Sequence, residues 1–490
     1  MLIGCFLDVE TWITPFSENI MAAGLLICFC MVATTLLPME FSQASPAALN
    51  QEGSFPSIHQ LQLQQNFPDL IPPGGIPPQY IPLASGRDRL ERNLVGFLPY
   101  WMGTSWQNFP PQLVTHVCWF ALELNAAGGI DAQHGWPDGP LVDYFHSHGV
   151  PVLVTATLFG GADLATLLNS PTYRANACNN MLERMRAGDA DGIMIDFEQL
   201  PASQYWNMLT FMNELRSAVD QAGVEDGRLY RLMVCTPAVD WAGSYGYSGL
   251  SDCCDALFIM CYNYYWSGST TTGPVAPASG WGNYNVDWSV QDHLNYNGNR
   301  PDKLLVGMPW YGYDWPCLSA EPGTATSGAG TARIYSSARD LALEQGWQRE
   351  TIAQTPWTPY LAEGWRQCWH EDTVSLGLKL DLVEIYDLQG AGVWALGYQG
   401  EWSEVWVQIE QRLVGEPPGG VADLQIELHD GGVRLSWSPL PGATAYMIHA
   451  SSDPYFSPTP GTLLFTQAAT WFNAPASDSA CFYRVVGVIE

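Results

Sequence analysis

The chain is poor in charged residues, and poorest in positive charge. Charged residues make up 14% of its 490 residues, and 19 Lys and Arg stand against 49 Asp and Glu. The usual charged fraction is about a quarter. The net charge is −30 with histidine counted as neutral. Such a surface repels nucleic acid phosphates and anionic membranes, so we expect neither as a partner and favour a neutral ligand.

Several chemical signatures are missing. The sequence has no phosphate loop, no dinucleotide fingerprint and no Gly-x-Ser-x-Gly nucleophile elbow. Its 12 cysteines follow no zinc-binding spacing, so we expect neither a metal nor another cofactor. Cys118, Cys235 and Cys261 lie in apolar runs and are predicted to be core thiols. Cys317 and Cys368 are a candidate disulfide.

The N-terminal region lacks basic residues. No Lys or Arg precedes Arg87, yet an uncharged apolar run of 17 residues spans 21–37, and the small-x-small triplet Ser42-Gln43-Ala44 follows it. We predict a signal peptide over residues 1–44, and a secreted, periplasmic or cell-surface protein. The missing basic segment leaves two alternatives open, which are a start at another Met and an uncleaved anchor. Residues 45–91 are polar and proline-rich, and they are predicted to be a linker with no fold.

Short apolar runs and helical stretches alternate from residue 92 to 415. A helix is expected over 203–222, with Met208, Phe211, Leu215 and Val219 on one face. Eight buried strands with intervening helices indicate a (β/α)8 TIM barrel, an α/β fold whose chemistry sits at the C-terminal ends of the strands. The eight predicted strands are Leu94–Tyr100, His116–Ala121, Val150–Ala156, Gly192–Glu198, Leu232–Pro237, Ala256–Tyr262, Lys303–Pro309 and Gly392–Gly397.

Two further units are expected. Residues 312–391 are too many for a plain loop, and we predict a small α+β insertion that forms one wall of a groove. Residues 416–490 contain short alternating strands, which predict a C-terminal all-β sandwich. Tryptophan and tyrosine are plentiful, at 21 and 22 copies, and such a surplus suits a groove that stacks on sugar rings.

The octet Asp191–Glu198 reads DGIMIDFE and is the most informative segment of the chain. Its alternation is that of a strand, so Asp196 and Glu198 point to the same side, together with Met194. The repulsion between two adjacent carboxylates raises the pKa of one of them. A site can use this effect to keep a carboxylic acid protonated and ready to donate.

The octet resembles the Asp-Gly-x-Asp-x-Asp-x-Glu signature of family 18 glycoside hydrolases, with Met194 where the family has its second Asp. Met260-Cys-Tyr-Asn263 resembles the sixth-strand motif of that family, and residues 303–312 and 392–394 resemble its seventh and eighth strands. Residues 155–161 replace the usual Ser-x-Gly-Gly of the third strand. The core aromatics of the C-terminal unit resemble those of a fibronectin type III domain; they are Trp437, Tyr446 and Tyr483.

The resemblance implies a role for each matching residue. Glu198 would be the general acid and then the base, and Asp196 would hydrogen-bond the substrate's own N-acetyl group as it closes on the anomeric carbon. Tyr262 would donate to the acetamido oxygen, Asn263 would bind the sugar, and Trp394 would form the floor under the reacting ring. Further substrate-binding candidates are Trp310, Tyr311 and Trp266. Additional groove candidates are Trp357 and Trp369, while Asp191 would be structural.

These residues imply an exported hydrolase of the chitinase-like or spore-cortex-lytic-like branch. It would cleave β-linkages next to N-acetylglucosamine, in chitin-type or peptidoglycan glycans, with retention and without a metal. We expect a monomer whose partner is an N-acetylglucosamine-containing polysaccharide. One alternative is a non-catalytic, lectin-like protein on the same barrel, which Glu198 argues against. Another is a surface adhesin, which the single fibronectin-like unit argues against.

Overall fold

The computed structural model describes residues 56–65, 90–413, 424–429, 432–440, 443–451, 463–475 and 482–489. The predicted signal peptide or anchor lies outside these ranges. Within them, no helix combines the length and the apolar character that crossing a membrane requires.

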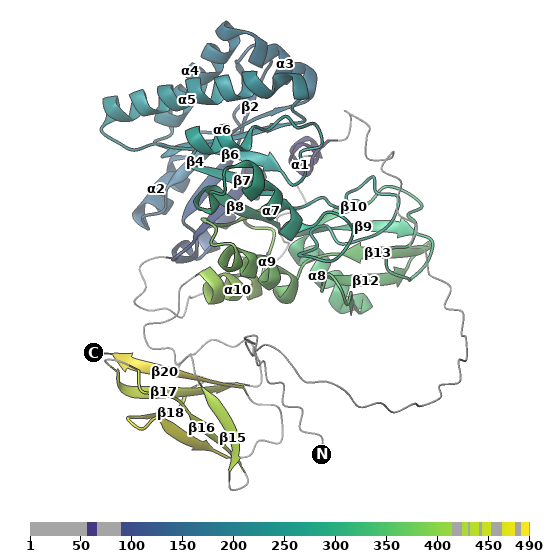
Figure 1. Ribbon diagram of the computed structural model, residues 1–490. Coiled ribbons are helices and arrows are strands. Elements are labelled where there is room, and N and C mark those ends of the chain that lie inside the picture. The colour runs from purple at the N-terminus through teal and green to yellow at the C-terminus, as the bar shows by residue number, and fades with distance from the viewer. Residues whose placement is uncertain are drawn as a thin grey trace, which may run out of the picture. The chain divides into compact units, whose positions relative to one another are not determined.

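Eight parallel strands form a closed barrel (Figure 1). The strand order is β1-β14-β8-β7-β6-β5-β4-β2, and pairing of β1 with β2 closes the ring. The eight predicted strands are confirmed, with small differences at their ends. They are β1 (Asn93–Pro99), β2 (His116–Leu124), β4 (Val152–Phe159), β5 (Gly192–Glu198), β6 (Arg231–Pro237), β7 (Ala256–Met260), β8 (Leu304–Pro309) and β14 (Gly390–Trp394). The short β3 (Ile130–Ala132) adds to β2 in antiparallel fashion.

Helices cover the outside of the barrel (Figure 1). The predicted helix over 203–222 is α5 (Tyr205–Asp226), and its four predicted core residues are fully buried. Gly227 ends α5 with a left-handed φ of 67°, which glycine adopts without a Cβ penalty. The other barrel helices are α2 (Gly139–Ser147), α3 (Gly161–Asn169), α4 (Pro171–Ala187), α6 (Tyr247–Cys253), α7 (Val286–Tyr296), α9 (Thr373–Ile385) and α10 (Glu404–Leu413). Short 3-10 turns lie at Tyr100–Met102, Ser105–Asn108, Pro111–Leu113, Ala202–Gln204 and Pro301–Lys303.

Strand β5 shows how the sequence pattern positions the acids. All seven of its residues are buried. Phe197 stacks on Phe211 of α5, with ring centroids 5.4 Å apart, so its side of the strand faces the helices. Alternation then turns Asp196 and Glu198 into the barrel. The predicted core thiols are also buried, at Cys118, Cys235 and Cys261.

The predicted α+β insertion is present between β8 and α9. Its five-stranded antiparallel sheet has the order β10-β9-β13-β12-β11. The elements are β9 (Tyr311–Cys317), β10 (Thr331–Ile334), α8 (Tyr335–Gln345), β11 (Gln348–Arg349), β12 (Pro356–Leu361) and β13 (Trp365–Trp369). The expected boundary at 391 was too late, because α9 contacts β8 and β14 of the barrel.

Two expectations for this lobe were wrong. Cys317 and Cys368 are free thiols. They lie on adjacent strands, but Cys317 pairs with Trp365, three residues from Cys368 and therefore about 10 Å along the strand, which is too far for a disulfide. Trp357 and Trp369 are buried and stack on each other with centroids 5.6 Å apart, so they are core residues of the lobe.

The C-terminal residues form two three-stranded antiparallel sheets. One sheet has the order β15-β16-β19 and the other β18-β17-β20. Their shared core contains Leu435, Trp437, Tyr446, Ile448 and Val485. The strands are β15 (Gln425–His429), β16 (Gly432–Ser436), β17 (Ala443–Ser451), β18 (Leu463–Gln467), β19 (Trp471–Ala474) and β20 (Phe482–Ile489). The all-β unit is therefore present, and its fibronectin type III identity stays a prediction.

The predicted linker contains a folded segment. Helix α1 (Ile58–Gln65) forms within residues 45–91, where we expected no fold. Ser57 caps the helix, because its Oγ accepts the Gln60 N–H at 3.0 Å. Ile58, His59, Gln62 and Leu63 are buried. The expectation was wrong for these residues because an eight-residue helix draws its stability from the surface it packs on and leaves little local signal.

Candidate active site

The site is built on two carboxylates of β5. Asp196 is fully buried and Glu198 is 7% exposed. Both point inward from the C-terminal half of the strand, as the alternation predicted. Oδ1 of Asp196 has no hydrogen-bond partner among the described residues. An acid pair buried at the C-terminal end of a barrel strand is where the chemistry of this fold is expected.

The surroundings of Glu198 favour its protonated form. Burial raises its pKa well above the usual value, and the charge of Asp196 raises it further. A hydrogen bond from Ser57 Oγ to Glu198 Oε1, 2.7 Å long, opposes these two effects. The net shift leaves Glu198 suited to donate a proton at a pH where an ordinary carboxyl is ionised.

The loop after β7 supplies polar groups. Tyr262 is 4% exposed, and burial raises its pKa, so it remains an O–H donor. Asn263 adopts a left-handed φ of 60°, a conformation that asparagine tolerates better than most residues. Its Oδ1 accepts a hydrogen bond from Tyr311 Oη at 2.7 Å. Tyr262, Asn263 and Tyr311 therefore lie together near the acid pair, and their catalytic and substrate-binding roles stay predictions.

Trp394 closes the floor of the barrel mouth. It is fully buried at the end of β14, and its ring packs against Phe97 and Phe120 at centroid distances of 5.6 and 4.8 Å. The ring of His59 stacks on the ring of Trp394, with centroids 3.8 Å apart. The residue predicted to support a sugar ring is therefore covered by another planar ring, and its role toward a sugar stays a prediction.

Met194 lies where the resembled family has an acid. It is fully buried, and it pairs in register with Thr155 of β4. The Thr155 hydroxyl is buried and has no partner among the described residues. The position therefore combines an apolar side chain with a neighbouring hydroxyl that a polar residue at 194 could satisfy.

Three residues of the segment around α1 bind the predicted site residues: Ser57 and His59 bind the predicted catalytic residues, and Gln62 binds Trp394. His59 Nδ1 lies 2.8 Å from Asp196 Oδ2, and His59 Nε2 lies 2.8 Å from Tyr262 Oη. A carboxylate can only accept hydrogen bonds, so we assign the hydrogen of His59 to Nδ1, and Nε2 then accepts from the Tyr262 hydroxyl. Gln62 Oε1 accepts from Trp394 Nε1 at 2.7 Å.

His59, Asp196 and Glu198 also have the composition of a metal site. Their candidate ligand atoms lie within 4.8 Å of one another. Ligands of a tetrahedral zinc ion are separated by about 3.3 Å, given metal–ligand bonds of about 2.0–2.1 Å. The 2.8 Å separation of His59 Nδ1 and Asp196 Oδ2 fits a direct hydrogen bond better. We therefore treat the three as a hydrogen-bonded cluster.

Two predicted substrate-binding residues, Trp310 and Trp266, do not contact the acid pair in any hydrogen bond or ring contact described for them. Trp310 is fully buried and packs edge-on against Trp406 of α10, with centroids 5.2 Å apart, so it belongs to the core. Trp310 lies in the bend between β8 and β9, outside both strands, so the strand pattern did not indicate which way its side chain points. Trp266 is partly buried, and its carbonyl accepts a hydrogen bond from Trp315 of the lobe. Its backbone therefore lies against the lobe, and its role in substrate binding stays a prediction.

Asp191 is structural, as expected. It begins the octet at the opposite end of β5 from Glu198, and it binds His146 Nε2, the Val152 N–H and Arg228 Nη2 at 2.7, 2.8 and 2.7 Å. These contacts tie the start of β5 to its neighbours.

The sequence analysis missed Ser57, His59 and Gln62, and also Tyr398, whose Oη donates to Gln62 Oε1 at 2.8 Å. For the first three, the available signal was a Ser N-cap followed by apolar residues at helical spacing within a polar, proline-rich stretch. Nothing local indicates that such a helix would lie against an octet about 140 residues away, since Ser57 and Glu198 are 141 positions apart.

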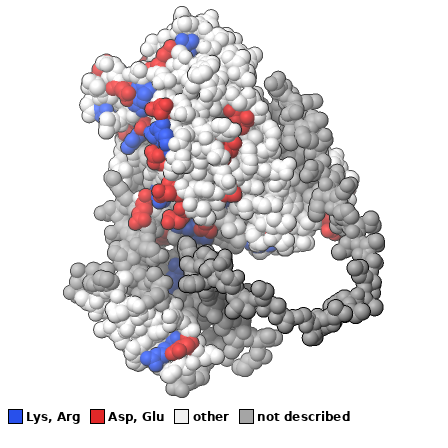
Figure 2. All heavy atoms as spheres, in the orientation of Figure 1, with Lys and Arg blue, Asp and Glu red and all other residues white. Residues whose placement is uncertain are grey.

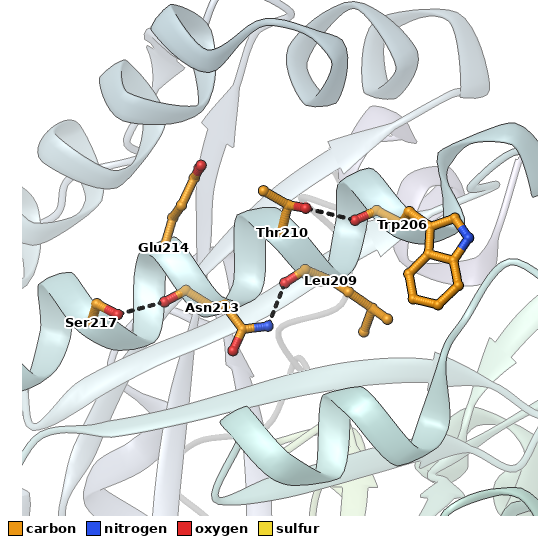
Figure 3. Close-up of a pocket in the computed structure, with 6 residues that line it drawn as sticks. All are labelled: Trp206, Leu209, Thr210, Asn213, Glu214 and Ser217. Carbon is orange, nitrogen blue, oxygen red and sulfur yellow. Dashed lines mark hydrogen bonds between the residues drawn. The ribbon is translucent and has the colours of Figure 1, made fainter.

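A shallow hollow runs along α5, lined by Trp206, Leu209, Thr210, Asn213, Glu214 and Ser217 (Figure 3). Thr210, Asn213 and Ser217 each donate to the carbonyl four residues earlier in the helix. Their donors are thus used within the helix, and the hollow offers less chemistry than the barrel mouth. Figure 2 shows a face on which uncharged residues predominate, which suits a neutral ligand.

The chain is similar to several known glycoside hydrolases. The chain is 29% identical over 286 residues to YdhD of Bacillus subtilis (strain 168), whose name assigns it to sporulation-specific glycosylases. This match covers 56% of the chain and 64% of YdhD, so the chain spans less than two thirds of that relative. It is 27% identical over 315 residues to the di-N-acetylchitobiase of Mus musculus, covering 58% of the chain and 82% of the relative.

A third relative and a solved structure are also similar to the chain. The cortical fragment-lytic enzyme of Bacillus subtilis (strain 168) is 27% identical over 258 residues, which is 50% of the chain and 55% of that enzyme. A class V chitinase variant from Nicotiana tobaccum, solved with NAG4, has a TM-score of 0.60 at 18% identity, covering 66% of the chain and 99% of the chitinase. At this identity the likeness shows the fold. The model for "Glycosyl hydrolases family 18" matches residues 93–399, and the chain therefore belongs to glycosyl hydrolase family 18.

Proposed function

We propose that the protein is a hydrolase that cleaves β-glycosidic bonds next to N-acetylglucosamine, with retention and with the substrate's own acetamide as nucleophile. The observation that carries the proposal is the buried Asp196–Glu198 pair, in which Glu198 has a raised pKa, beside Tyr262 and above Trp394. Family membership alone does not establish turnover, so the acid pair is the support for catalysis.

In the first step, Glu198 gives its proton to the glycosidic oxygen as that oxygen leaves the anomeric carbon. The acetamido carbonyl oxygen of the same sugar forms a bond to the anomeric carbon, which yields an oxazolinium ion. Asp196 accepts the acetamido N–H and stabilises the positive charge, while Tyr262 donates to the carbonyl oxygen and holds it in line. Trp394 supports the sugar ring from below.

In the second step, Glu198 acts as the base. Its carboxylate removes a proton from water, and the resulting hydroxyl group attacks the anomeric carbon. The bond to the acetamido oxygen breaks, and the acetamide is restored. Two displacements at one carbon give retention, and Glu198 regains its proton.

The relatives indicate two substrate classes. The names of two of them refer to chitobiose and to spore cortex, and both materials contain N-acetylglucosamine. A net charge of −30 disfavours a strongly anionic wall polymer, so chitin-type oligomers are our first choice.

Reducing ends released from chitin oligomers and from peptidoglycan test the proposal, with mass spectrometry of the products. We expect cleavage of at least one polymer by the native chain and its loss in Glu198→Gln. Cleavage that persists in Glu198→Gln would remove Glu198 from the mechanism. Sugar binding without cleavage, both in the native chain and after the site has been opened as described below, would favour the lectin-like alternative.

We also propose export, supported by the apolar run over 21–37 and the Ser42-Gln43-Ala44 triplet. N-terminal sequencing of the protein recovered outside the cytoplasm tests it. A new N-terminus at residue 45 is the expected result, and an intact Met1 on a membrane-bound protein would support an uncleaved anchor. The fibronectin-like assignment of residues 416–490 and the monomeric state remain part of the same proposal, and sedimentation measures the latter.

A further inference from the structure

The segment Ser57–Leu63 occupies the barrel mouth that the proposed reaction needs. His59 is fully buried between Asp196 and Tyr262, and Gln62 is 1% exposed against Trp394. The Ser57 hydroxyl donates a hydrogen bond to Glu198, the proposed proton donor, at 2.7 Å. One short segment thus contacts both acids, the tyrosine and the tryptophan platform.

The hydrogen-bonding pattern of His59 matches that of an acetamide. Its Nδ1–H points to the carboxylate of Asp196, and its Nε2 accepts from the Tyr262 hydroxyl, both at 2.8 Å. An acetamido group presents the same pair, an N–H donor and a carbonyl acceptor. The planar imidazole also stacks on Trp394 at 3.8 Å, where the reacting sugar ring is proposed to lie.

Gln62 also occupies hydrogen-bonding positions that a sugar could use. Its carbonyl oxygen accepts hydrogen bonds from Trp394 Nε1 and Tyr398 Oη, at 2.7 and 2.8 Å. These two donors lie in a fully buried part of the barrel mouth and would lack partners if the segment left and nothing replaced it. A sugar hydroxyl or acetamido oxygen is the kind of acceptor that could replace it.

We propose that Ser57–Leu63 is an internal pseudosubstrate, which holds the enzyme latent by filling the N-acetylglucosamine site and has to leave before a glycan can bind. This inference rests on the function proposed above. Occupancy by the segment and by a sugar is mutually exclusive, because Asp196, His59 and Trp394 are all fully buried in the occupied state.

The segment has the properties of a removable inhibitor. An eight-residue helix is marginal in water on its own, so α1 keeps its structure only while it is docked. Its position in the same chain gives it an effective concentration on the order of millimolar at the site. A weakly binding segment can therefore compete with a glycan, and a long oligomer that makes more contacts can displace it.

The alternative is that His59 is a permanent part of the catalytic machinery, orienting Asp196. The two readings predict opposite results when His59 is replaced. A permanent helper is needed for turnover, so its loss lowers kcat. A pseudosubstrate blocks turnover, so its loss lowers the apparent KM and raises the rate at low substrate.

His59→Glu in the full chain separates them. The new carboxylate would face the carboxylate of Asp196, and the repulsion between the two charges expels the segment, also when residue 198 is neutral. Leu61→Glu is the matched control, since Leu61 is a half-buried residue of the same helix. We expect His59→Glu to bind the N-acetylglucosamine tetramer about tenfold more tightly or better, as a latent fraction of nine tenths or more would require, and Leu61→Glu to change little.

Binding is measured by calorimetry in the Glu198→Gln background, so that it does not depend on hydrolysis. Tighter binding in His59→Glu supports the pseudosubstrate whether or not the native chain cleaves glycans. Equal or weaker binding in His59→Glu, with a thermal unfolding curve like that of Leu61→Glu, overturns it. Because Glu could itself disturb the acids, His59→Ala and Gln62→Ala are measured too, and tighter binding is again the supporting result.

Hydrogen exchange of residues 57–63 in the Glu198→Gln chain gives a second readout. We expect their amides to lose protection when the tetramer is added, because the helix unfolds on leaving the site. Retained protection at saturating tetramer would show that sugar and segment bind together, and would overturn the proposal. Failure of the proposed function is seen separately, as absence of cleavage by His59→Glu with Glu198 intact.

Discussion

The barrel mouth and the inserted lobe both bury a carboxylate completely, and they treat it differently. Asp314 of the lobe binds Arg333 Nε at 2.8 Å, Arg366 Nε at 3.0 Å and Tyr360 Oη at 2.7 Å. Asp196 of the barrel has a second acid as its neighbour, and the ring of His59 as the donor to one oxygen. Its other oxygen has no partner among the described residues.

The contrast shows how to separate a structural acid from a chemical one. A buried charge is costly, and two guanidinium groups offset that cost for Asp314 within its own sheet. No guanidinium group of the described residues offsets the cost at Asp196 and Glu198, and burial together with the neighbouring Asp196 raises the pKa of Glu198. In the lobe, Asp314 holds strands together through its ion pairs. In the barrel, Asp196 and Glu198 have no such ion pairs with arginine among the described residues and remain available for a reaction.

Replacing Glu198 by Gln should have the largest effect of all. We expect kcat to fall by about 10³-fold or more, because general acid–base catalysis contributes about 10²–10⁴. Stability should not fall, since Gln has nearly the shape of the protonated, neutral acid and leaves Asp196 without a charged neighbour at any pH. Initial rates and urea denaturation of the same preparation measure both. A large loss of stability with unchanged kcat would place Glu198 in the structural class and break the contrast.

Asp196→Asn should lower kcat by about 10²-fold, since it removes the charge that stabilises the oxazolinium ion. Asp191→Asn is the matched control at the other end of the same strand, where the carboxylate binds His146 and Arg228. It should lower stability and leave kcat within a few-fold. Equal losses of kcat in the two variants would contradict a special role for Asp196.

The pH profile of activity tests whether the charge of Asp196 acts on the pKa of Glu198. Activity requires protonated Glu198, so it is lost as pH rises through the pKa of that group, and a raised pKa moves this loss to higher pH. Removing the charge of Asp196 lowers the pKa of Glu198, so the alkaline limb of kcat/KM in Asp196→Asn should move to lower pH. An alkaline limb that stays in place would show that Asp196 does not act on Glu198.

Asp314→Asn should act on stability alone. It leaves Arg333 and Arg366 without their anion, and we expect a loss of about 2 kcal/mol, smaller than for a fully buried pair because both arginines are partly exposed. The urea midpoint measures it, and kcat should remain within a few-fold. A change of kcat as large as that of Asp196→Asn would erase the difference between the two regions.

Met194→Asn should have the smallest effect. The Thr155 hydroxyl beside it lacks a partner, so a polar side chain at 194 has a hydrogen bond available that offsets part of the lost apolar burial. We expect a stability change of about 1 kcal/mol and a shift in the pH profile with kcat within about tenfold. Met194→Leu, which keeps the apolar volume, is the control and should leave the profile unchanged.

Local pattern predicted much of the fold. The eight strands and α5 were visible because buried strands and amphipathic helices impose their own periods on the sequence. The same period placed Asp196 and Glu198 on one face, and the order of strands brought Tyr262 and Trp394 to the same mouth. It did not distinguish Trp310 from Tyr311, because Trp310 lies in a bend between two strands and packs on Trp406 of α10, a contact that the local pattern does not show.

Within residues 56–65, the local pattern did not predict helix α1. The stretch reads as part of a polar, proline-rich linker, and its helix is too short to leave a strong signal. Cys317 and Cys368 were misjudged for a related reason, since strand register decides whether two thiols meet.

The sequence by itself determined the barrel, the acid pair and the family, because each is written in residues close together along the chain. Only the tertiary structure decided what fills the site. Residues 57, 59 and 62 reach acids and aromatics between 137 and 336 positions away. Such contacts depend on the shape and donors of a pocket that exists only after folding, and a sequence pattern read locally carries no trace of them.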